Sequence, residues 1–200
     1  MGDVDGDGIA DFAISAIHGS GDEAGDTSLS GTVTIYKGGG NGQIIKKISG
    51  DGPMAKFGYS LAAGDVNGDG KPDLIVGAPF NTNTPSLYQS GAVYVYLAPD
   101  FTTRVALYAS TTYKSLGLGV AAGDVNSDGI ADLLMNASRT ISGVTYNNVL
   151  VYFGGSTFAP TTNSPNITLT SASSGFGKAI SIIGDLDGDG KKEIAIGAPN

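Results

Sequence analysis

The chain has 200 residues and a formal net charge of −8, which argues against a nucleic-acid partner because such partners require a basic face. Glycine contributes 32 residues and charged residues only 15%, a composition that disfavours helical bundles and coiled coils. Cysteine is absent, which excludes disulfides and thiolate zinc sites, and no apolar run approaches the ~18 residues of a membrane-spanning helix, so no membrane insertion is expected.

Acidic residues concentrate in four short stretches that recur along the chain. They read GDVDGDGIADFAISA, GDVNGDGKPDLIVGAP, GDVNSDGIADLLMNA and GDLDGDGKKEIAIGAP, and their first acids are separated by 62, 59 and 61 residues. So steady a period predicts a repeat architecture. We expect one repeat region, 1–200, made of repeats at approximately 1–55, 56–114, 115–174 and 175–200, of which the first and last are partial.

The segments around the acidic stretches predict short β-strands. One full period contains four of them, at residues 58–64, 73–78, 91–97 and 104–110. The strand after each acidic stretch is continuously apolar, as in strands that are buried on both faces. Four strands per period predict an all-β fold of β-propeller blades, which are four-stranded antiparallel sheets. An ordinary β-sandwich would explain the strands but not the period of about 60 residues.

The number of strands predicts a partial propeller of about three blades. The repeat gives three strands in the first unit, four in each of the next two and two in the last, hence 13 strands in the chain. An open arc exposes two apolar blade faces, which invites aggregation. We therefore expect either the remainder of a longer chain or a second copy of this chain to close the propeller.

Each acidic stretch has the form D-x-[DN]-x-D-G-x-x-[DE], which predicts a calcium loop. Oxygens from positions 1, 3, 5 and 9 and a backbone carbonyl at position 7 suit a hard cation that accepts about six to eight oxygens. About four Ca²⁺ per chain are expected, and four would neutralise the net charge of −8. The predicted metal ligands are Asp3, Asp5, Asp7, Ile9, Asp11, Asp65, Asn67, Asp69, Lys71, Asp73, Asp124, Asn126, Asp128, Ile130, Asp132, Asp185, Asp187, Asp189, Lys191 and Glu193.

An EF-hand begins with the same spacing of acids, but the later positions of the stretches exclude it. An EF-hand requires a bidentate Glu at position 12 and flanking helices. Position 12 is apolar in all four stretches and falls in a predicted strand. A turn rich in Asp and Gly would explain one stretch, but not four in register.

Short motifs beside the acidic stretches resemble a known family. Phe57-Gly58 and Phe176-Gly177 precede the stretches, and Gly77-Ala78-Pro79 and Gly197-Ala198-Pro199 come after them. The chain thus resembles the FG-GAP repeats of the integrin α-subunit β-propeller and its microbial relatives. The resemblance implies that each calcium loop joins the first and second strands of a blade at the rim of one propeller face, while ligands engage the other face or a side. The third repeat departs from the motifs, with Leu116-Gly117 and Asn136-Ala137-Ser138 in their places.

Catalytic residues are not expected. Nearly all carboxylates belong to the acidic stretches, His18 is the one histidine, and Ser60 does not complete a G-x-S-x-G motif. The protein is therefore predicted to be a binding module rather than an enzyme.

Three functions remain open at the level of the sequence: adhesion or protein recognition, as the resemblance implies; glycan binding; and a structural spacer in a larger surface protein. Candidate ligand-binding loops at 18–31, 80–90 and 138–148 carry polar and aromatic residues, namely Asp22, Glu23, Asp26, Tyr88, Gln89, Arg139, Tyr146, Asn147 and Asn148. Calcium loops of moderate affinity are saturated outside cells, and absence of cysteine is ordinary for a bacterial surface protein. An extracellular or cell-surface, microbial location is expected.

Overall fold

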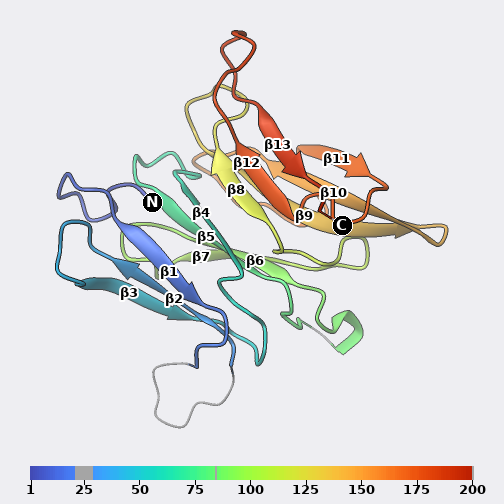
Figure 1. The fold of residues 1–200 in the computed structure, drawn as a ribbon, viewed down its shortest axis with the longest axis horizontal. Coiled ribbons are helices and arrows are strands. Elements are labelled where there is room, and N and C mark those ends of the chain that lie inside the picture. The colour runs from blue at the N-terminus through green and yellow to red at the C-terminus, as the bar shows by residue number, and fades with distance from the viewer. Residues whose placement is uncertain (21–28, 84, 200) are drawn as a thin grey trace.

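Thirteen β-strands form four antiparallel sheets in the computed structural model, which describes residues 1–20, 29–83 and 85–199 (Figure 1). The first sheet contains β1 (Phe12–Ala16), β2 (Thr32–Tyr36) and β3 (Ile44–Ser49). The second contains β4 (Ser60–Gly64), β5 (Asp73–Ala78), β6 (Ala92–Tyr96) and β7 (Arg104–Tyr108). The third contains β8 (Val120–Gly123), β9 (Asp132–Ile141), β10 (Val144–Tyr152) and β11 (Ile167–Ser171). The last contains β12 (Ala179–Ile182) and β13 (Ile194–Gly197), and a short 3₁₀ helix, η1 (Pro85–Leu87), lies between β5 and β6.

The predicted number of strands and their division among the repeats are confirmed. Within each sheet the strands follow one another in chain order, as in β4-β5-β6-β7, and every neighbouring pair is antiparallel. The first strands β4, β8 and β12 contact one another in succession, as expected of the inner strands of propeller blades. The chain is therefore an all-β, partial β-propeller, and we refer to the four sheets as blades 1 to 4.

Apolar side chains fill the spaces between successive blades. Strand β5 is buried along its whole length. Its Leu74 and Val76 belong to the core shared with blade 1, whereas Ile75 belongs to the core shared with blade 3. This placement explains why the strand is continuously apolar, because each of its faces meets another sheet.

Phe57 and Leu116 occupy equivalent buried positions where the chain enters blades 2 and 3. Phe57 has no exposed surface and lies 5.7 Å from the ring of Tyr94. Leu116, which stands where the motif has Phe, is also fully buried. Each residue is followed by a glycine in the left-handed region, Gly58 (φ 88°) or Gly117 (φ 85°). The substitution of Leu for Phe therefore preserves the buried position in blade 3.

One predicted loop is wrong: residues 138–148 form the tip of the long β9–β10 hairpin. Ile141 pairs with Val144, so only Ser142 and Gly143 make the turn. Both have positive φ, 50° and 82°, as a two-residue hairpin turn requires. The β-branched and aromatic residues on both sides favour extended strands over a loop.

Candidate metal centres

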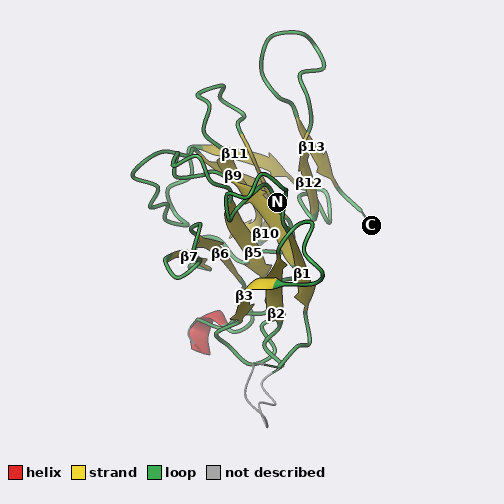
Figure 2. Ribbon diagram, turned by 90° about the vertical axis from the view of Figure 1, so that its left-hand side faces the viewer, coloured by secondary structure: helices red, strands yellow, loops and turns green. Residues whose placement is uncertain are grey.

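The four acidic stretches form loops at the same end of the blades, which we number loops 1 to 4 (residues 3–11, 65–73, 124–132 and 185–193). Loops 2, 3 and 4 connect the first and second strands of their blades, and loop 1 precedes β1. Figure 2 shows the β12–β13 connection, which contains loop 4, at the opposite end of the molecule from η1. Neighbouring loops are in contact, since the Ala131 N–H donates to the Asp65 carbonyl (2.9 Å) and Ser127 Oγ donates to the Gly190 carbonyl (3.2 Å).

The first carboxylate of each loop is held by backbone N–H groups from the loop itself. In loop 2, Asp65 Oδ1 accepts from the N–H of Gly68 (2.7 Å) and Oδ2 accepts from the N–H of Gly70 (2.7 Å). The corresponding pair of hydrogen bonds is present in loops 1, 3 and 4. Four segments far apart in sequence therefore share one local geometry, in which the chain curves around the first carboxylate.

The backbone conformation at position 6 explains why every loop has a glycine there. The φ angles of Gly8, Gly70, Gly129 and Gly190 lie between 85° and 89°. An added Cβ would meet no atom within 4 Å at any of these glycines, so backbone conformation rather than space requires them.

In loops 1 to 3 the carboxylate at position 9 is buried and connects two parts of the blade. Asp73 is fully buried, and its Oδ2 accepts from the Val66 N–H (3.0 Å) while Oδ1 accepts from the Ala98 N–H (2.9 Å) beyond β6. Asp11 and Asp132 make the same two kinds of hydrogen bond in blades 1 and 3. In loop 4, Glu193 Oε2 accepts from the Leu186 N–H (2.6 Å). The residue at position 9 thus fastens loops 1, 2 and 3 to their blades.

Burial and neighbouring negative charge disfavour ionisation at position 9. Burial raises the pKa of the Asp73 carboxyl to about 6; the nearby carboxylates of Asp69 and Asp65 also raise it, and the two backbone N–H groups oppose this rise. Burial raises the pKa of Asp132 in the same way. A cation at the loop would favour the ionised forms.

The predicted ligands have a donor set and a spacing that fit a hard cation. One carboxylate oxygen from each of Asp3, Asp5 and Asp11 lies within 4.8 Å of the others. The same holds for the four acids of loop 4, Asp185, Asp187, Asp189 and Glu193. Loops 2 and 3 have an amide at position 3, Asn67 or Asn126, beside three carboxylates. These all-oxygen sets suit Ca²⁺, which stays a prediction.

At position 7, the N–H of Ile9, Lys71, Ile130 or Lys191 donates to the carboxylate at position 5 at 2.8–2.9 Å. These hydrogen bonds fix the place of each position-7 residue in its loop. Their carbonyls stay the predicted ligands.

One basic residue of the first site could not be recognised from the acidic motif. Lys37 lies beyond β2, and its Nζ donates to carboxylate oxygens of Asp5 and, at 2.8 Å, of Asp7. It is distant from loop 1 in sequence, and only the blade register brings it there. A comparison of the residues after the third strand of each repeat would have identified it.

The remaining predicted surface residues are divided among several places. Tyr88 is 69% exposed and, with Met54 and Gln89, lines a groove of about 350 Å³ near η1. Asn147 donates to the Ser173 carbonyl (3.0 Å), and Asn148 is buried in β10. Arg139 and Tyr146 are paired across the β9–β10 hairpin. Residues Asp22, Glu23 and Asp26 lie outside the described part of the chain.

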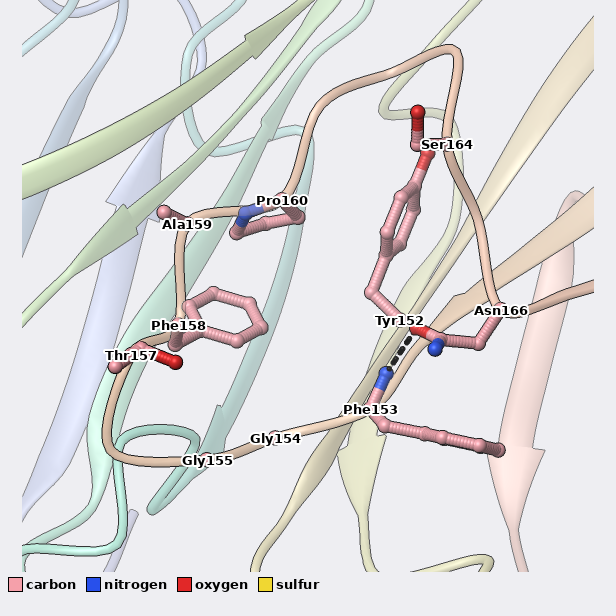
Figure 3. A pocket seen from close by; sticks show the side chains of 10 residues that line it. All are labelled: Tyr152, Phe153, Gly154, Gly155, Thr157, Phe158, Ala159, Pro160, Ser164 and Asn166. Atoms are coloured by element: carbon pink, nitrogen blue, oxygen red, sulfur yellow. Dashed lines mark hydrogen bonds between the residues drawn. The ribbon is translucent and has the colours of Figure 1, made fainter.

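A second hollow, of about 200 Å³, lies under the connection between β10 and β11 (Figure 3). Two of its polar groups are engaged locally: the Phe153 N–H donates to Asn166 Oδ1 (2.9 Å), and Tyr152 OH donates to the Thr162 carbonyl (3.1 Å). Its lining contains no carboxylate, histidine or lysine. We therefore assign this hollow to the packing of the connection.

No helix in the described residues is long and apolar enough to span a membrane.

Comparisons with known proteins identify the repeats. A family model described as FG-GAP repeat matches residues 57–96 and 116–153, and one described as FG-GAP-like repeat matches residues 3–76. Phosphatidylinositol-glycan-specific phospholipase D of Rattus norvegicus is 32% identical over 161 residues, which cover 74% of this chain and 19% of that protein. Integrin alpha-PS5 of Drosophila melanogaster is 31% identical over 171 residues (79% and 17%), and integrin alpha-5 of Xenopus laevis is 35% identical over 151 residues (72% and 14%). The chain spans less than a fifth of the length of these relatives.

Proposed function

Because the chain belongs to the FG-GAP repeat family, we propose that it is a calcium-binding, extracellular β-propeller module for adhesion or protein recognition. The observation that carries the proposal is the repetition of one loop geometry at one end of four successive blades. In each loop, backbone N–H groups hold the first carboxylate. Three or four carboxylates gather in loops 1 and 4, and the amide at position 3 donates to the carboxylate at position 5 in loops 2 and 3. Such repetition of an all-oxygen donor set is expected of bound cations rather than of four unrelated turns.

Calcium would have a structural role at these loops. The predicted ligands at positions 1, 3, 5, 7 and 9 would hold the ion, and its two positive charges would offset the repulsion among three or four carboxylates. Since the position-9 carboxylate of loops 1 to 3 also accepts a backbone N–H from beyond the third strand of the blade, the ion would tie these loops to their sheets. The contacts between neighbouring loops would extend this order along the rim.

Calorimetric titration tests the metal directly. Protein stripped with EDTA and then desalted should take up about four Ca²⁺ per chain. Asp69→Ala should reduce this number by one, whereas Asp100→Ala, outside the loops, should leave it unchanged. Uptake of no calcium by the folded wild-type chain would overturn the proposal.

We further propose that other blades of a longer chain complete the propeller. Phe12 and Ile14 on β1 are 46% and 55% exposed, although they occupy the same blade positions as the buried Leu74 and Val76. The Phe12 ring stacks on Tyr36, with ring centroids 5.4 Å apart, and this forms an apolar face suited to another sheet. The much greater length of the relatives favours more blades over a second copy of this chain. Light scattering on the isolated chain, with and without calcium, distinguishes the two: a stable dimer supports the second, whereas a monomer or self-association without a defined size supports the first.

The ligand of the module is proposed to be a protein. A glycan is the second candidate, and the observation in its favour is the exposed Tyr88 ring beside the amide of Gln89 in the groove near η1. Aromatic and amide groups at one place are typical of sugar sites. A glycan array with the wild-type chain and Tyr88→Ala decides between them: glycan binding that is lost in the variant would favour the second candidate. A spacer would bind neither class.

Catalysis is not proposed for this segment. One relative is named as a phospholipase D, but the matched region covers only 19% of it, and the acids of this chain lie mostly in the proposed calcium loops. The proposed location is the outside of a microbial cell, where calcium concentrations saturate loops of moderate affinity.

A further inference from the structure

We propose that Lys37 is a built-in cation of loop 1, which competes with calcium for Asp5 and Asp7 and makes loop 1 a weaker calcium site than it would be without the lysine. This inference rests on the proposed calcium-binding function. It concerns a residue outside the repeated motif, which neither the motif nor the spacing of the acids includes.

The contact is made by two carboxylates at once. Lys37 Nζ donates to Asp5 Oδ2 and to Asp7 Oδ2, the latter at 2.8 Å. The Lys37 backbone is fixed by its N–H, which donates to the Gln43 carbonyl (2.9 Å). Next to it, the Gly38 N–H donates to Asp11 Oδ1 (2.8 Å). The ammonium group thus enters loop 1 from a segment that is itself fastened to that loop.

The hydrogen bonds to position 9 show which residues correspond to Lys37 in the other blades. The N–H groups of Gly38, Ala98 and Gly154 all donate to the position-9 carboxylate of their own blade. The residues immediately before them are therefore equivalent: Lys37, Leu97 and Phe153. Blades 2 and 3 thus place an apolar side chain where blade 1 places an ammonium group, and Leu97 lines a hollow together with Asn67 and Asp69.

The lysine accompanies a difference within the loop. In loops 2 and 3, the position-3 amide donates to the position-5 carboxylate: Asn67 Nδ2 to Asp69 Oδ2 (3.2 Å) and Asn126 Nδ2 to Asp128 Oδ2 (2.9 Å). Loop 1 has Asp5 at position 3, and an ionised carboxylate cannot donate. Lys37 supplies the missing donor and bridges positions 3 and 5. It also offsets the charge of one of the four carboxylates of loop 1, whereas loops 2 and 3 have three carboxylates each.

Calcium and the ammonium group would compete for the same two carboxylates, those of Asp5 and Asp7. Positions 3 and 5 are predicted ligands, and a dication there would repel Lys37 at short range. Binding must therefore break the two ion pairs. Lys37 therefore has opposite effects on the two states of loop 1: it stabilises the calcium-free loop and weakens the affinity of the loop for calcium. A residue that merely packed against the loop would favour both states.

Per-loop NMR titration with CaCl₂ tests this. The amides of Gly8, Gly70, Gly129 and Gly190 each donate to the first carboxylate of their own loop, so their ¹H–¹⁵N signals report the four loops separately. Lys37→Leu introduces the residue that blade 2 has naturally. It should lower the calcium midpoint at Gly8 by about three- to tenfold, as expected for loss of exposed ion pairs, and leave the Gly129 midpoint unchanged. In EDTA the same variant should melt about 1–4 °C lower than wild type.

Two further variants complete the test. Lys178→Leu removes the same charge from the turn before β12 and should leave the Gly8 midpoint in place. Leu97→Lys places an amine beside Asp69 and should raise the Gly70 midpoint, so the question is answered even if Lys37→Leu does not fold. Unchanged midpoints at Gly8 in Lys37→Leu or at Gly70 in Leu97→Lys would overturn the role of Lys37. If no glycine amide of the wild-type chain responds to calcium, it is the proposed function that fails.

Discussion

Asp73→Asn and Asp69→Asn form a matched pair of substitutions that separates the two roles of a loop carboxylate. Both change one acid of loop 2 into its amide. Asp73 is fully buried and accepts two backbone N–H groups, one from Val66 and one from Ala98. Asp69 is exposed, and its carboxylate accepts from the loop's own Asn67 and Lys71. Only the first therefore holds the loop to the blade.

The magnitude can be worked from the hydrogen bonds. An amide at position 73 keeps one acceptor oxygen but turns an NH₂ group towards the other backbone donor, which is then buried without a partner. Such a loss costs about 1–3 kcal/mol of unfolding free energy. Asp69→Asn leaves no buried donor unpaired, so in EDTA its effect should stay within ~0.5 kcal/mol. With calcium at about 100 times its dissociation constant, each occupied loop contributes about 2.7 kcal/mol. An amide is a weaker calcium ligand than a carboxylate, so both variants should lose part of that amount at loop 2.

Urea unfolding in EDTA and in excess calcium measures the loss of unfolding free energy for each of the two variants in each condition. We expect Asp73→Asn to be less stable than wild type in both conditions and Asp69→Asn to be less stable only in calcium. Equal stability of the two variants in EDTA would refute the assignment of Asp73 as the residue that fastens loop 2 to the blade. Equal stability of Asp69→Asn and wild type in calcium would refute its assignment as a ligand.

Three other predictions concern the core, the pH dependence and the exposed face. Phe57→Ala should lower the free energy of chemical unfolding by about 3–5 kcal/mol because the ring is fully buried. Phe57→Leu, which copies Leu116, should lower it by less than about 1.5 kcal/mol. Equal losses in the two variants would contradict the equivalence of positions 57 and 116. The pKa of Asp73 is 3.8 in the unfolded chain and about 6 in the folded protein, so between these values the folded state holds a proton that the unfolded state has released. In EDTA this bound proton stabilises the folded state at pH 4, and the stabilisation is lost as the pH rises through 6. Wild type should therefore lose stability relative to Asp73→Ala over that interval, and parallel pH profiles would contradict it. Ile14→Lys, on the exposed face of β1, should reduce self-association in light scattering without lowering the melting temperature, and a large drop in that temperature would show that Ile14 is already buried.

The blades could be predicted from the sequence because the same pattern of acidic loop and apolar run recurs in each period. A continuous apolar run such as 73–78 is ambiguous by itself, but four such runs after four similar loops fix both the strand and its place in a blade. The β9–β10 hairpin was missed because Ser142-Gly143 is a weak turn signal, and Arg139 and Asn147 look like loop residues when their cross-strand partners are unknown.

The loop acids could be selected from spacing, whereas their partners could not. The Ala98 N–H that reaches Asp73 and the Lys37 amine that reaches Asp5 come from segments more than twenty residues away, beyond the third strand of each blade. Such contacts depend on strand register, which pairing between strands decides and local sequence does not. The double role of position 9, as predicted ligand and as fastening to the blade, was invisible for the same reason.

Anomalous diffraction from crystals grown in calcium is the most direct test of the central claim that the four acidic loops bind this ion. We predict one anomalous peak in each loop, with oxygens of positions 1, 3, 5, 7 and 9 at about 2.3–2.6 Å. Well-ordered loops without an anomalous peak in any of the four would contradict it.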